Sequence, residues 1–229
     1  MVLRDPVSSA SHLLTAVWAV YATLLLIRLT RPGDGRRAAV GVYGLSMVLL
    51  YLASGTFHGL FYATPDEKRF FQKLDQSAIF LLIAGTSTPI LATLLDGRMR
   101  RAFLRLTWGL ALAGIGCLWL LPMAPHAVSV VLYVVIGWVG VGPVVHFYRA
   151  VGWRAMNWVW AGAAFYTAGA VCELAEWPAG WEWPVRFGFH EVLHLCDSAG
   201  SVMFFVFVVR HIIPYERPAA GTPPLRLAA

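Results

Sequence analysis

Charged residues are scarce in this chain of 229 residues, in which they make up 13% of the sequence. An average soluble domain is about a quarter charged and about half apolar, whereas 59% of this chain is hydrophobic. Cysteine is scarce too, and its three widely separated copies give neither a disulfide framework nor a thiolate metal site. These shortages exclude an ordinary soluble domain. They predict an all-α integral membrane protein in which the cysteines are small buried hydrophobes: Cys117, Cys172 and Cys196.

Acidic residues are fewer than basic ones: the chain has 12 aspartates and glutamates and 18 lysines and arginines, which gives a net charge of +6. A basic chain can bind nucleic acid, but these arginines cluster between apolar segments, as in the cytoplasmic loops of membrane proteins. We therefore expect no nucleic acid partner. The first apolar run lacks a small-residue cleavage site followed by a soluble domain, so we expect a membrane helix there and not a signal peptide.

Apolar runs of membrane-spanning length are abundant. A membrane helix needs about 20 mostly apolar residues, and charged or turn-rich loops divide the sequence into seven such stretches. Ten tryptophans and eight tyrosines suit the two interfaces of a seven-transmembrane-helix bundle. We predict one membrane domain over residues 1–213, without a second domain, and a disordered tail over residues 214–229. The predicted transmembrane helices cover residues 12–30, 38–62, 74–95, 102–121, 127–148, 155–177 and 188–213.

The distribution of lysine and arginine predicts the orientation in the membrane. With seven predicted helices, thirteen of these residues lie on the side of the membrane that holds the C-terminus, and five lie on the side that holds the N-terminus. Cytoplasmic loops are enriched in both residues, so the count predicts a multi-pass protein of the cell membrane with its N-terminus outside and its C-terminus in the cytoplasm. The five residues on the outer side are Arg4, Lys68, Arg69, Lys73 and Arg186.

A pair of histidines stands inside the last apolar run, in the letters His190-Glu-Val-Leu-His194. Residues four apart share a helix face, so both imidazoles can bind one metal ion. The letters match the zinc-protease motif H-E-x-x-H, and ionisable groups inside a membrane helix are costly and usually functional. Glu191 turns about 100° away from the ligand face, although the corresponding glutamate of soluble zinc proteases acts as the base, so its role stays open.

Three more polar side chains approach the same membrane interface at a similar depth. The predicted helix 38–62 carries Ser54 and His58 four residues apart near its end, and the helix 74–95 carries Asp75 at its start. Catalytic zinc takes three protein ligands and keeps a fourth position for water. We therefore predict a zinc ion held by His58, His190 and His194, with its water activated by Asp75.

Each of these residues also has a simpler interpretation. A lone histidine near a helix end is more often an interfacial side chain, but the pair spacing and the matched depth argue against this for the three ligands. Asp75 also suits the positive end of a helix dipole. Ser54 suits equally a bond to a carbonyl of its own helix and a bond to the water or ligands of the metal.

The remaining candidates are weaker. Asp197 lies deeper on the ligand face, as an outer hydrogen-bond partner of the ligands or as a helix contact. His12 begins the first predicted helix on the side of the site and is a candidate outer contact. His126 lies in a loop on that side, where we expect it to be exposed, whereas His146 and His211 lie toward the opposite face of the membrane.

Three motifs extend along nearly the whole chain, on the second, third and seventh predicted helices: Ser54-Gly-Thr-Phe-His58, the run from Leu74 to Pro89 that holds Asp75, and His190-x-x-x-His194. Together they resemble the hemolysin III proteins, the bacterial branch of the progestin and adipoQ receptor family. The resemblance implies a seven-helix protein with a buried zinc held by the three histidines, and a water between the metal and Asp75. The animal receptors have a cytoplasmic N-terminus, opposite to the orientation that the arginine count predicts here.

The resemblance also extends to membrane-embedded hydrolases such as the alkaline ceramidases, which implies hydrolysis of a lipid amide. Our leading hypothesis is therefore a zinc-dependent hydrolase of a lipid amide or ester, in which Ser54 and Gln76 steady the water or the developing charge. One alternative is a non-catalytic sensor or receptor whose zinc staples two helices, with a membrane lipid as its ligand. An intramembrane protease is disfavoured because the third ligand, His58, lies upstream. Another alternative is a haemolysin-like pore, with a polar path suggested by Glu173, Glu176 and Asp197.

Overall fold

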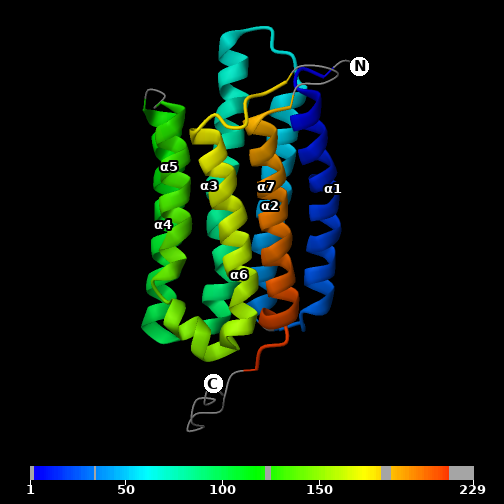
Figure 1. Cartoon of the computed structure of the whole chain (residues 1–229). Coiled ribbons are helices and arrows are strands. Elements are labelled where there is room, and N and C mark those ends of the chain that lie inside the picture. The colour runs from blue at the N-terminus through cyan, green and yellow to red at the C-terminus, as the bar shows by residue number, and fades with distance from the viewer. Residues whose placement is uncertain (1–2, 34, 122–124, 182–186, 217–229) are drawn as a thin grey trace.

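The computed structural model describes residues 3–33, 35–121, 125–181 and 187–216, most of which are helical. The helices run side by side as a bundle, with α1 beginning at one end and the described chain leaving α7 at the other (Figure 1). We call the end at which α1 begins the N-terminal end. Most of the predicted tail, residues 217–229, lies outside the described residues. The α-helices are α1 (Pro6–Leu29), α2 (Gly35–Gly59), α3 (Pro65–Leu94), α4 (Gly97–Leu120), α5 (His126–Gly137), α6 (Val144–Leu174) and α7 (Phe189–Phe207).

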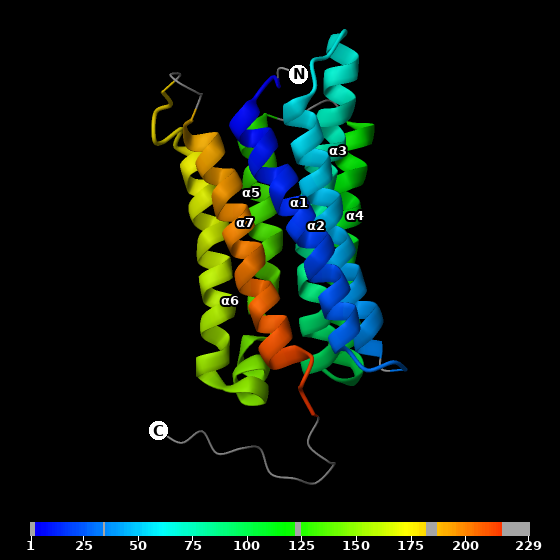
Figure 2. The same ribbon diagram turned by 90° about the vertical axis from the view of Figure 1, so that its right-hand side faces the viewer.

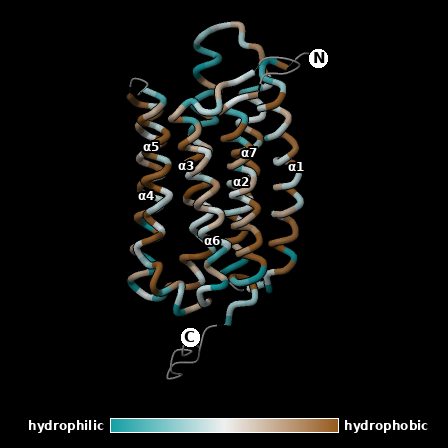
Figure 3. The backbone as a smooth tube through the Cα atoms, viewed as in Figure 1, coloured by the Kyte–Doolittle hydropathy of each residue, from teal (hydrophilic) through white to brown (hydrophobic). Residues whose placement is uncertain are grey.

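Five of the described helices are long and apolar enough to cross a membrane: α1, α2, α3, α4, and α7 together with the π-helical η2 (Val208–Ile212). The α5 helix continues into the 3₁₀-helix η1 (Trp138–Val141), and this segment passes the same test when it is combined with α6. The two segments are bent by 78° relative to each other. The described chain therefore has five apolar spans, or six if the bent pair is one span. Hydrophobic residues follow the lengths of the helices, and hydrophilic ones gather toward both ends of the bundle (Figure 3). The predicted all-helical membrane protein is confirmed.

The bent pair differs from the separate helices expected at residues 127–148 and 155–177. The α5 helix ends at Gly137, and α6 begins directly after Pro143, whose missing N–H and fixed φ favour the start of a helix. Within α6, Gly152 has a φ of 80°, a conformation that glycine adopts without strain. After this kink α6 returns toward the N-terminal end of the bundle (Figure 1).

The α3 helix begins nine residues before the predicted start at residue 74. Thr64 accepts a hydrogen bond from the N–H of Glu67 (3.1 Å), and the Glu67 carboxylate accepts one from the N–H of Ala63 (2.9 Å). This reciprocal capping, followed by Pro65, specifies a helix start in a polar stretch that hydropathy alone assigns to a loop. The first turns of α3 consequently extend beyond the other helices (Figure 1).

Small residues allow the helices that carry the site to approach closely. A Cβ atom at Gly85 of α3 would collide with the side chain of Ser46 on α2, and one at Gly169 of α6 would collide with Cys196 on α7. Close approach at glycine is typical of membrane helix interfaces. The α7 helix lies between α6 and α1 (Figure 2) and packs on both. Its first turns thus lie beside the last turns of α6 and the first turns of α1.

Candidate metal centre

Three histidines from two helices meet at the N-terminal end of the bundle. His58 lies in the last turn of α2, while His190 and His194 lie in the first two turns of α7, where their four-residue spacing puts them on one face. One ring nitrogen of each lies within 4.8 Å of the others. The fold thus brings together the three side chains that the sequence predicted as metal ligands.

The spacing of the rings suits a small cation. The Nε2 atoms of His58 and His190 face each other at 3.1 Å. Two nitrogen ligands of a tetrahedral zinc ion, each about 2.0–2.1 Å from the metal, are separated by about 3.3 Å. The centroid of the third ring, that of His194, lies 4.8 Å from the His58 ring and 4.7 Å from the His190 ring. Three imidazoles can therefore surround one ion.

Asp5 contacts the ring nitrogen of His58 that points away from His190. Its Oδ2 lies 3.3 Å from Nδ1 of His58, and its own N–H donates to the His58 carbonyl oxygen (3.0 Å). Partial burial raises the pKa of the Asp5 carboxyl, but hydrogen bonds from His58 and Arg4 outweigh this and hold the pKa below its ordinary value of 3.8. An ionised Asp5 accepts a hydrogen bond from Nδ1–H, which leaves the lone pair of Nε2 for a metal.

Glu173, near the end of α6, holds the ring of His190 in the same way. Its Oε2 lies 3.1 Å from Nδ1 of His190, and its Oε1 lies 2.8 Å from Nε2 of His126. The Glu173 side chain is 5% exposed and that of His126 is 54% exposed. The buried carboxylate therefore connects a ligand of the centre to a histidine at the surface. His126 is exposed, as expected, but it is the first residue of α5 and has a defined partner.

The ring of His194 is oriented by the first turns of α1. Its Nδ1 lies 3.2 Å from the carbonyl oxygen of Ser8. The buried His12 ring stacks on it, with the centroids 3.7 Å apart and the planes 9° apart. Nε2 of His12 also lies 3.4 Å from the His194 carbonyl oxygen. His12 is thus an outer contact of the site, the role for which the sequence made it a candidate.

The donor set fits a zinc ion. Each imidazole has an oxygen acceptor beside Nδ1, so each carries its proton there and presents Nε2 as an acceptor. The facing Nε2 lone pairs of His58 and His190 repel each other unless a positive charge lies between them. Neutral imidazoles fixed by carboxylates or backbone carbonyls are the ligands that zinc commonly takes. His58, His190 and His194 are therefore the residues that would hold it.

Asp75 and Ser54 line the cavity beside the three histidines. Ser54 is on α2 and Asp75 is on the neighbouring helix α3. The adjacent Gln76 is buried, and its Oε1 atom has no hydrogen-bond partner in the described part of the chain. A carboxylate placed beside a metal centre can accept a proton from a nucleophile bound there. The cavity lining therefore carries a potential base, a hydroxyl and an amide close to the three histidines.

Glu191 has a structural task. Its carboxylate accepts hydrogen bonds from the N–H of Gly188 (2.7 Å) and from the Ser8 hydroxyl (2.8 Å). These contacts satisfy a free N–H at the start of α7 and join that helix to α1. Glu191 is buried and is not among the described residues that line the cavity. The structure therefore gives a capping role to the glutamate whose role the sequence left open.

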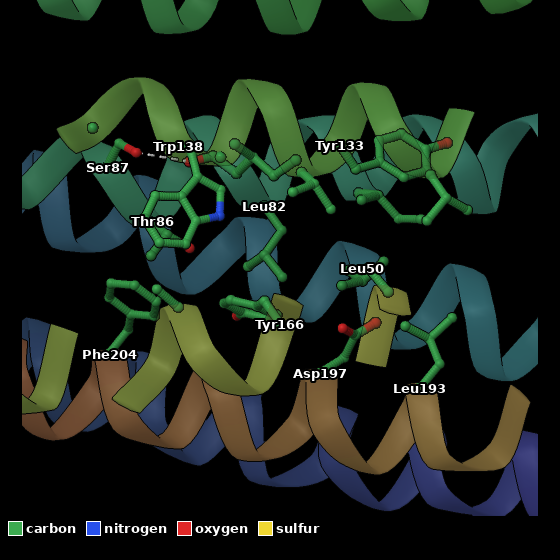
Figure 4. Close-up of a pocket in the computed structure, with 18 of the residues that line it drawn as sticks. Leu50, Leu82, Thr86, Ser87, Tyr133, Trp138, Tyr166, Leu193, Asp197 and Phe204 are labelled. Carbon is green, nitrogen blue, oxygen red and sulfur yellow. Dashed lines mark hydrogen bonds between the residues drawn. The ribbon is translucent and has the colours of Figure 1, made fainter. Parts of the chain in front are cut away.

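A cavity of about 300 Å³ extends from the three histidines into the bundle. Its walls are mostly apolar or aromatic, and no lysine or arginine of the described chain lines it. Figure 4 shows Leu193 and Tyr133 toward one end and Phe204 and Trp138 toward the other, with Leu82 between them. A mostly apolar cavity of this kind suits hydrocarbon, with the three histidines and Asp75 as candidate groups for polar chemistry.

Asp197, which the sequence predicted as either an outer partner of the ligands or a helix contact, lines the cavity. Its side chain points into the cavity (Figure 4), because a spacing of three residues from His194 keeps it on the ligand face and away from the backs of the imidazoles. His146 lies in the first turn of α6 and His211 lies in η2, both distant from the centre along the bundle, as the sequence indicated.

The sequence alone did not identify Asp5, Ser8 and Glu173 as partners of the histidines. Glu173 had a usable signal, since a carboxylate inside an apolar helix on the same side of the membrane needs a partner. Asp5 had a weaker one, as an acid just before the first apolar run. Ser8 acts through its backbone carbonyl, which any residue type could supply, so its identity carried no signal.

Comparisons with known proteins agree over nearly the whole chain. The profile of a family described as "Haemolysin-III related" matches residues 2–205. The chain is similar to the protein named Hemolysin-3 of Bacillus cereus, with 31% identity over 215 residues that cover 93% of this chain and 94% of that protein. It is also similar to the Hemolysin-3 homolog of Bacillus subtilis, with 28% identity over 172 residues that cover 75% and 76% of the two chains.

Proposed function

We propose that this chain, which belongs to the haemolysin-III related family, is a zinc-dependent hydrolase that cleaves a lipid amide or ester within the membrane. The observation that carries the proposal is the position of the three facing histidines, at the polar end of a long apolar cavity that also exposes Asp75. A structural metal site does not need an apolar cavity beside it, whereas a lipid hydrolase needs both a metal centre and a cavity for the hydrocarbon.

The residues around the cavity divide the chemical work. A zinc ion bound here would supply an activated water and polarise a carbonyl group. Asp75 accepts the proton of the attacking water and returns it to the leaving amine or alcohol. The Ser54 hydroxyl, which lines the same cavity, steadies the attacking water, and the Gln76 amide offers N–H groups to the developing charge. The apolar walls exclude bulk water and hold the acyl chain.

The lining of the cavity narrows the substrate class. No lysine or arginine is among the described lining residues, and Asp75 and Asp197 are in the walls, so away from the metal centre a phosphate group would meet negative charge and no cationic side chain. The preferred substrate is therefore a neutral lipid with a hydrocarbon chain and a carbonyl near one end, such as an N-acyl lipid of the ceramide class.

The test is hydrolysis by the protein purified in detergent, with the zinc content measured in the same samples. We expect the wild type to release fatty acid from N-acyl lipids, and Asp75→Ala to retain zinc while its rate falls by about a hundredfold or more. Asp66→Ala, at an exposed position on the same helix, is the matched control and should behave like the wild type. Full zinc with no hydrolysis in the wild type, over a broad panel of lipids, would remove the enzyme hypothesis.

That result would favour the second candidate, a non-catalytic sensor or receptor with a lipid ligand. One observation supports it: the ligands and the groups that orient them come from α2 and α7, from α6, and from the start of the chain, so a metal ion would tie these elements together. In that case the protein should bind lipid without cleaving it, and the bound lipid should raise the unfolding temperature of the protein. Lysis, the property in the name of the Bacillus cereus relative, is tested separately by leakage of dye from vesicles.

We also propose that the N-terminus faces the outside and the C-terminus the cytoplasm. The basis is the excess of lysine and arginine on the C-terminal side, together with the two ends of the described chain lying at opposite ends of the bundle (Figure 1). The metal centre would then open toward the outer face. A reporter that is active only in the cytoplasm should be active when it is fused to the C-terminus. A signal at the C-terminus from a reporter that is active only outside the cell membrane would overturn the orientation and leave the proposed chemistry unchanged.

A further inference from the structure

Asp197 is a carboxylate in the wall of the apolar cavity whose task the proposed hydrolysis leaves open. It lies on α7 three residues beyond His194, which places it about 4.5 Å deeper along the helix axis. In Figure 4 its oxygens point away from α7 into the cavity, across from Leu82 and Tyr133. Within the described residues, no hydrogen bond or ion pair engages this carboxylate, and the only polar contact of Asp197 with another helix uses its backbone carbonyl, which accepts from the Tyr51 hydroxyl (2.9 Å).

The polar groups closest to Asp197 along α7 are already committed to other partners. The Ser201 hydroxyl contacts the hydroxyls of Tyr51 (2.6 Å) and Tyr166 (2.8 Å). The Ser198 hydroxyl donates to the His194 carbonyl oxygen (3.0 Å). These contacts leave the two oxygens of Asp197 as acceptors directed at the space a ligand would occupy.

An acceptor in such a place is costly unless something donates to it. Carboxylates within membrane helices are expensive and mark functional sites by default. The Asp197 side chain is half-buried, and a ligand that fills the cavity would bury it fully, at a cost in free energy unless that ligand donates a hydrogen bond. Since no lysine or arginine of the described chain lines the cavity, the protein supplies no cation. The partner is therefore a hydrogen-bond donor carried by the ligand, and an anionic group at this depth is excluded by repulsion.

We propose that Asp197 is a specificity-determining residue that accepts a hydrogen bond from a hydroxyl group of the lipid. This inference rests on the proposed function, because it places the scissile carbonyl at the three histidines and the hydroxyl one helical turn deeper. The matching ligand is an N-acyl amino alcohol, in which a hydroxyl lies a few atoms from the amide. Its hydrocarbon then extends along the apolar wall toward Phe204 and Trp138 (Figure 4).

The experiment compares two lipids that differ only by the hydroxyl, N-lauroyl ethanolamine and N-lauroyl ethylamine. Their affinities are measured for the zinc-loaded protein in detergent by displacement of a fluorescent fatty acid, and mass spectrometry of the same samples checks that neither lipid has been cleaved. A hydrogen bond to a charged group is worth enough for a preference of about tenfold or more, so the wild type should favour the ethanolamide by that factor. Asp197→Leu should bind both lipids equally, through loss of affinity for the ethanolamide alone.

Three controls make the outcome decisive. Asp197→Asn keeps an oxygen acceptor and should retain part of the preference, which separates loss of the contact from loss of folding. Asp66→Leu, at an exposed acid of α3, should retain all of it. The zinc content should match the wild type in every variant, because Asp197 does not contact the three histidines.

The inference and the proposed function can fail separately. Equal affinity of the wild type for the two lipids, or a preference that survives in Asp197→Leu, would overturn the role of Asp197 and leave the hydrolase intact. A wild type that contains zinc and binds neither lipid would overturn both.

Discussion

The carboxylate of Glu173 lies 3.1 Å from Nδ1 of His190, so an acid at the end of α6 fixes the orientation of an imidazole on α7. The same carboxylate reaches the exposed His126 through its other oxygen, 2.8 Å away. Carboxylates of this kind fix the tautomer of a ligand histidine and raise its basicity. Glu173 is therefore a positioning residue of the centre, and not a ligand.

Replacing Glu173 by glutamine should weaken zinc binding without abolishing it. The amide keeps the size of the side chain but loses the charge that favours Nδ1–H on His190, and outer partners of this type typically contribute about ten- to a hundredfold in metal affinity. Competition with a chromogenic chelator measures the effect. Glu176→Gln, three residues later at an exposed position, should keep the affinity of the wild type. Equal affinities of the two variants would refute the positioning role.

Replacing Glu191 by alanine should lower stability and leave the chemistry intact. The change removes an acceptor from the start of α7 and leaves the buried Ser8 hydroxyl without its partner, at a cost of about 1–3 kcal/mol. Thermal unfolding in detergent should therefore begin at a lower temperature, with zinc per folded protein and hydrolysis per zinc unchanged. A variant of normal stability that retains zinc but no longer hydrolyses lipid would instead identify Glu191 as the base.

Replacing Gly85 by alanine should destabilise the contact between α2 and α3. The new Cβ would collide with both the Cβ and the Oγ of Ser46, so rotation of the serine cannot relieve the clash, and overpacking of this kind costs about 1–3 kcal/mol. Gly109→Ala on α4, where nothing lies within 4 Å of the added atom, should be neutral or slightly stabilising. The comparison of their unfolding midpoints is decisive, and a Gly85→Ala protein as stable as Gly109→Ala would contradict the packing.

The sequence predicted the membrane class and the family because both depend on local patterns. Long apolar runs report membrane helices directly, and motifs on the second, third and seventh helices identified the haemolysin-III related family that the comparisons confirm. The capped, polar start of α3 was missed since hydropathy does not register hydrogen bonds at Thr64. The bend between α5 and α6 was missed because its signals, Gly137 and Pro143, stood inside the apolar run 127–148, and the charged stretch after that run was taken as the loop.

The sequence predicted the histidines of the site, because their spacing within a helix and their depth in the membrane can be read from it. His190 and His194 share a face by local geometry, and His58 was matched to them by depth. Their orienting partners are a different matter, because contacts such as that of Ser8 with His194 join residues 186 positions apart. The sequence holds no local trace of such pairs, and the direction in which Asp197 points likewise emerged only from the packing of α7.

We propose above all that His58, His190 and His194 together hold one zinc ion. The most direct test is the metal content of the purified protein after supply of zinc, measured for the wild type and for the alanine variant of each histidine. His146→Ala, at a site outside the centre, is the control. We expect one zinc per chain in the wild type and the control, and loss of zinc in each of the three variants. Zinc that survives all three substitutions, or a folded wild type that binds none, would contradict it.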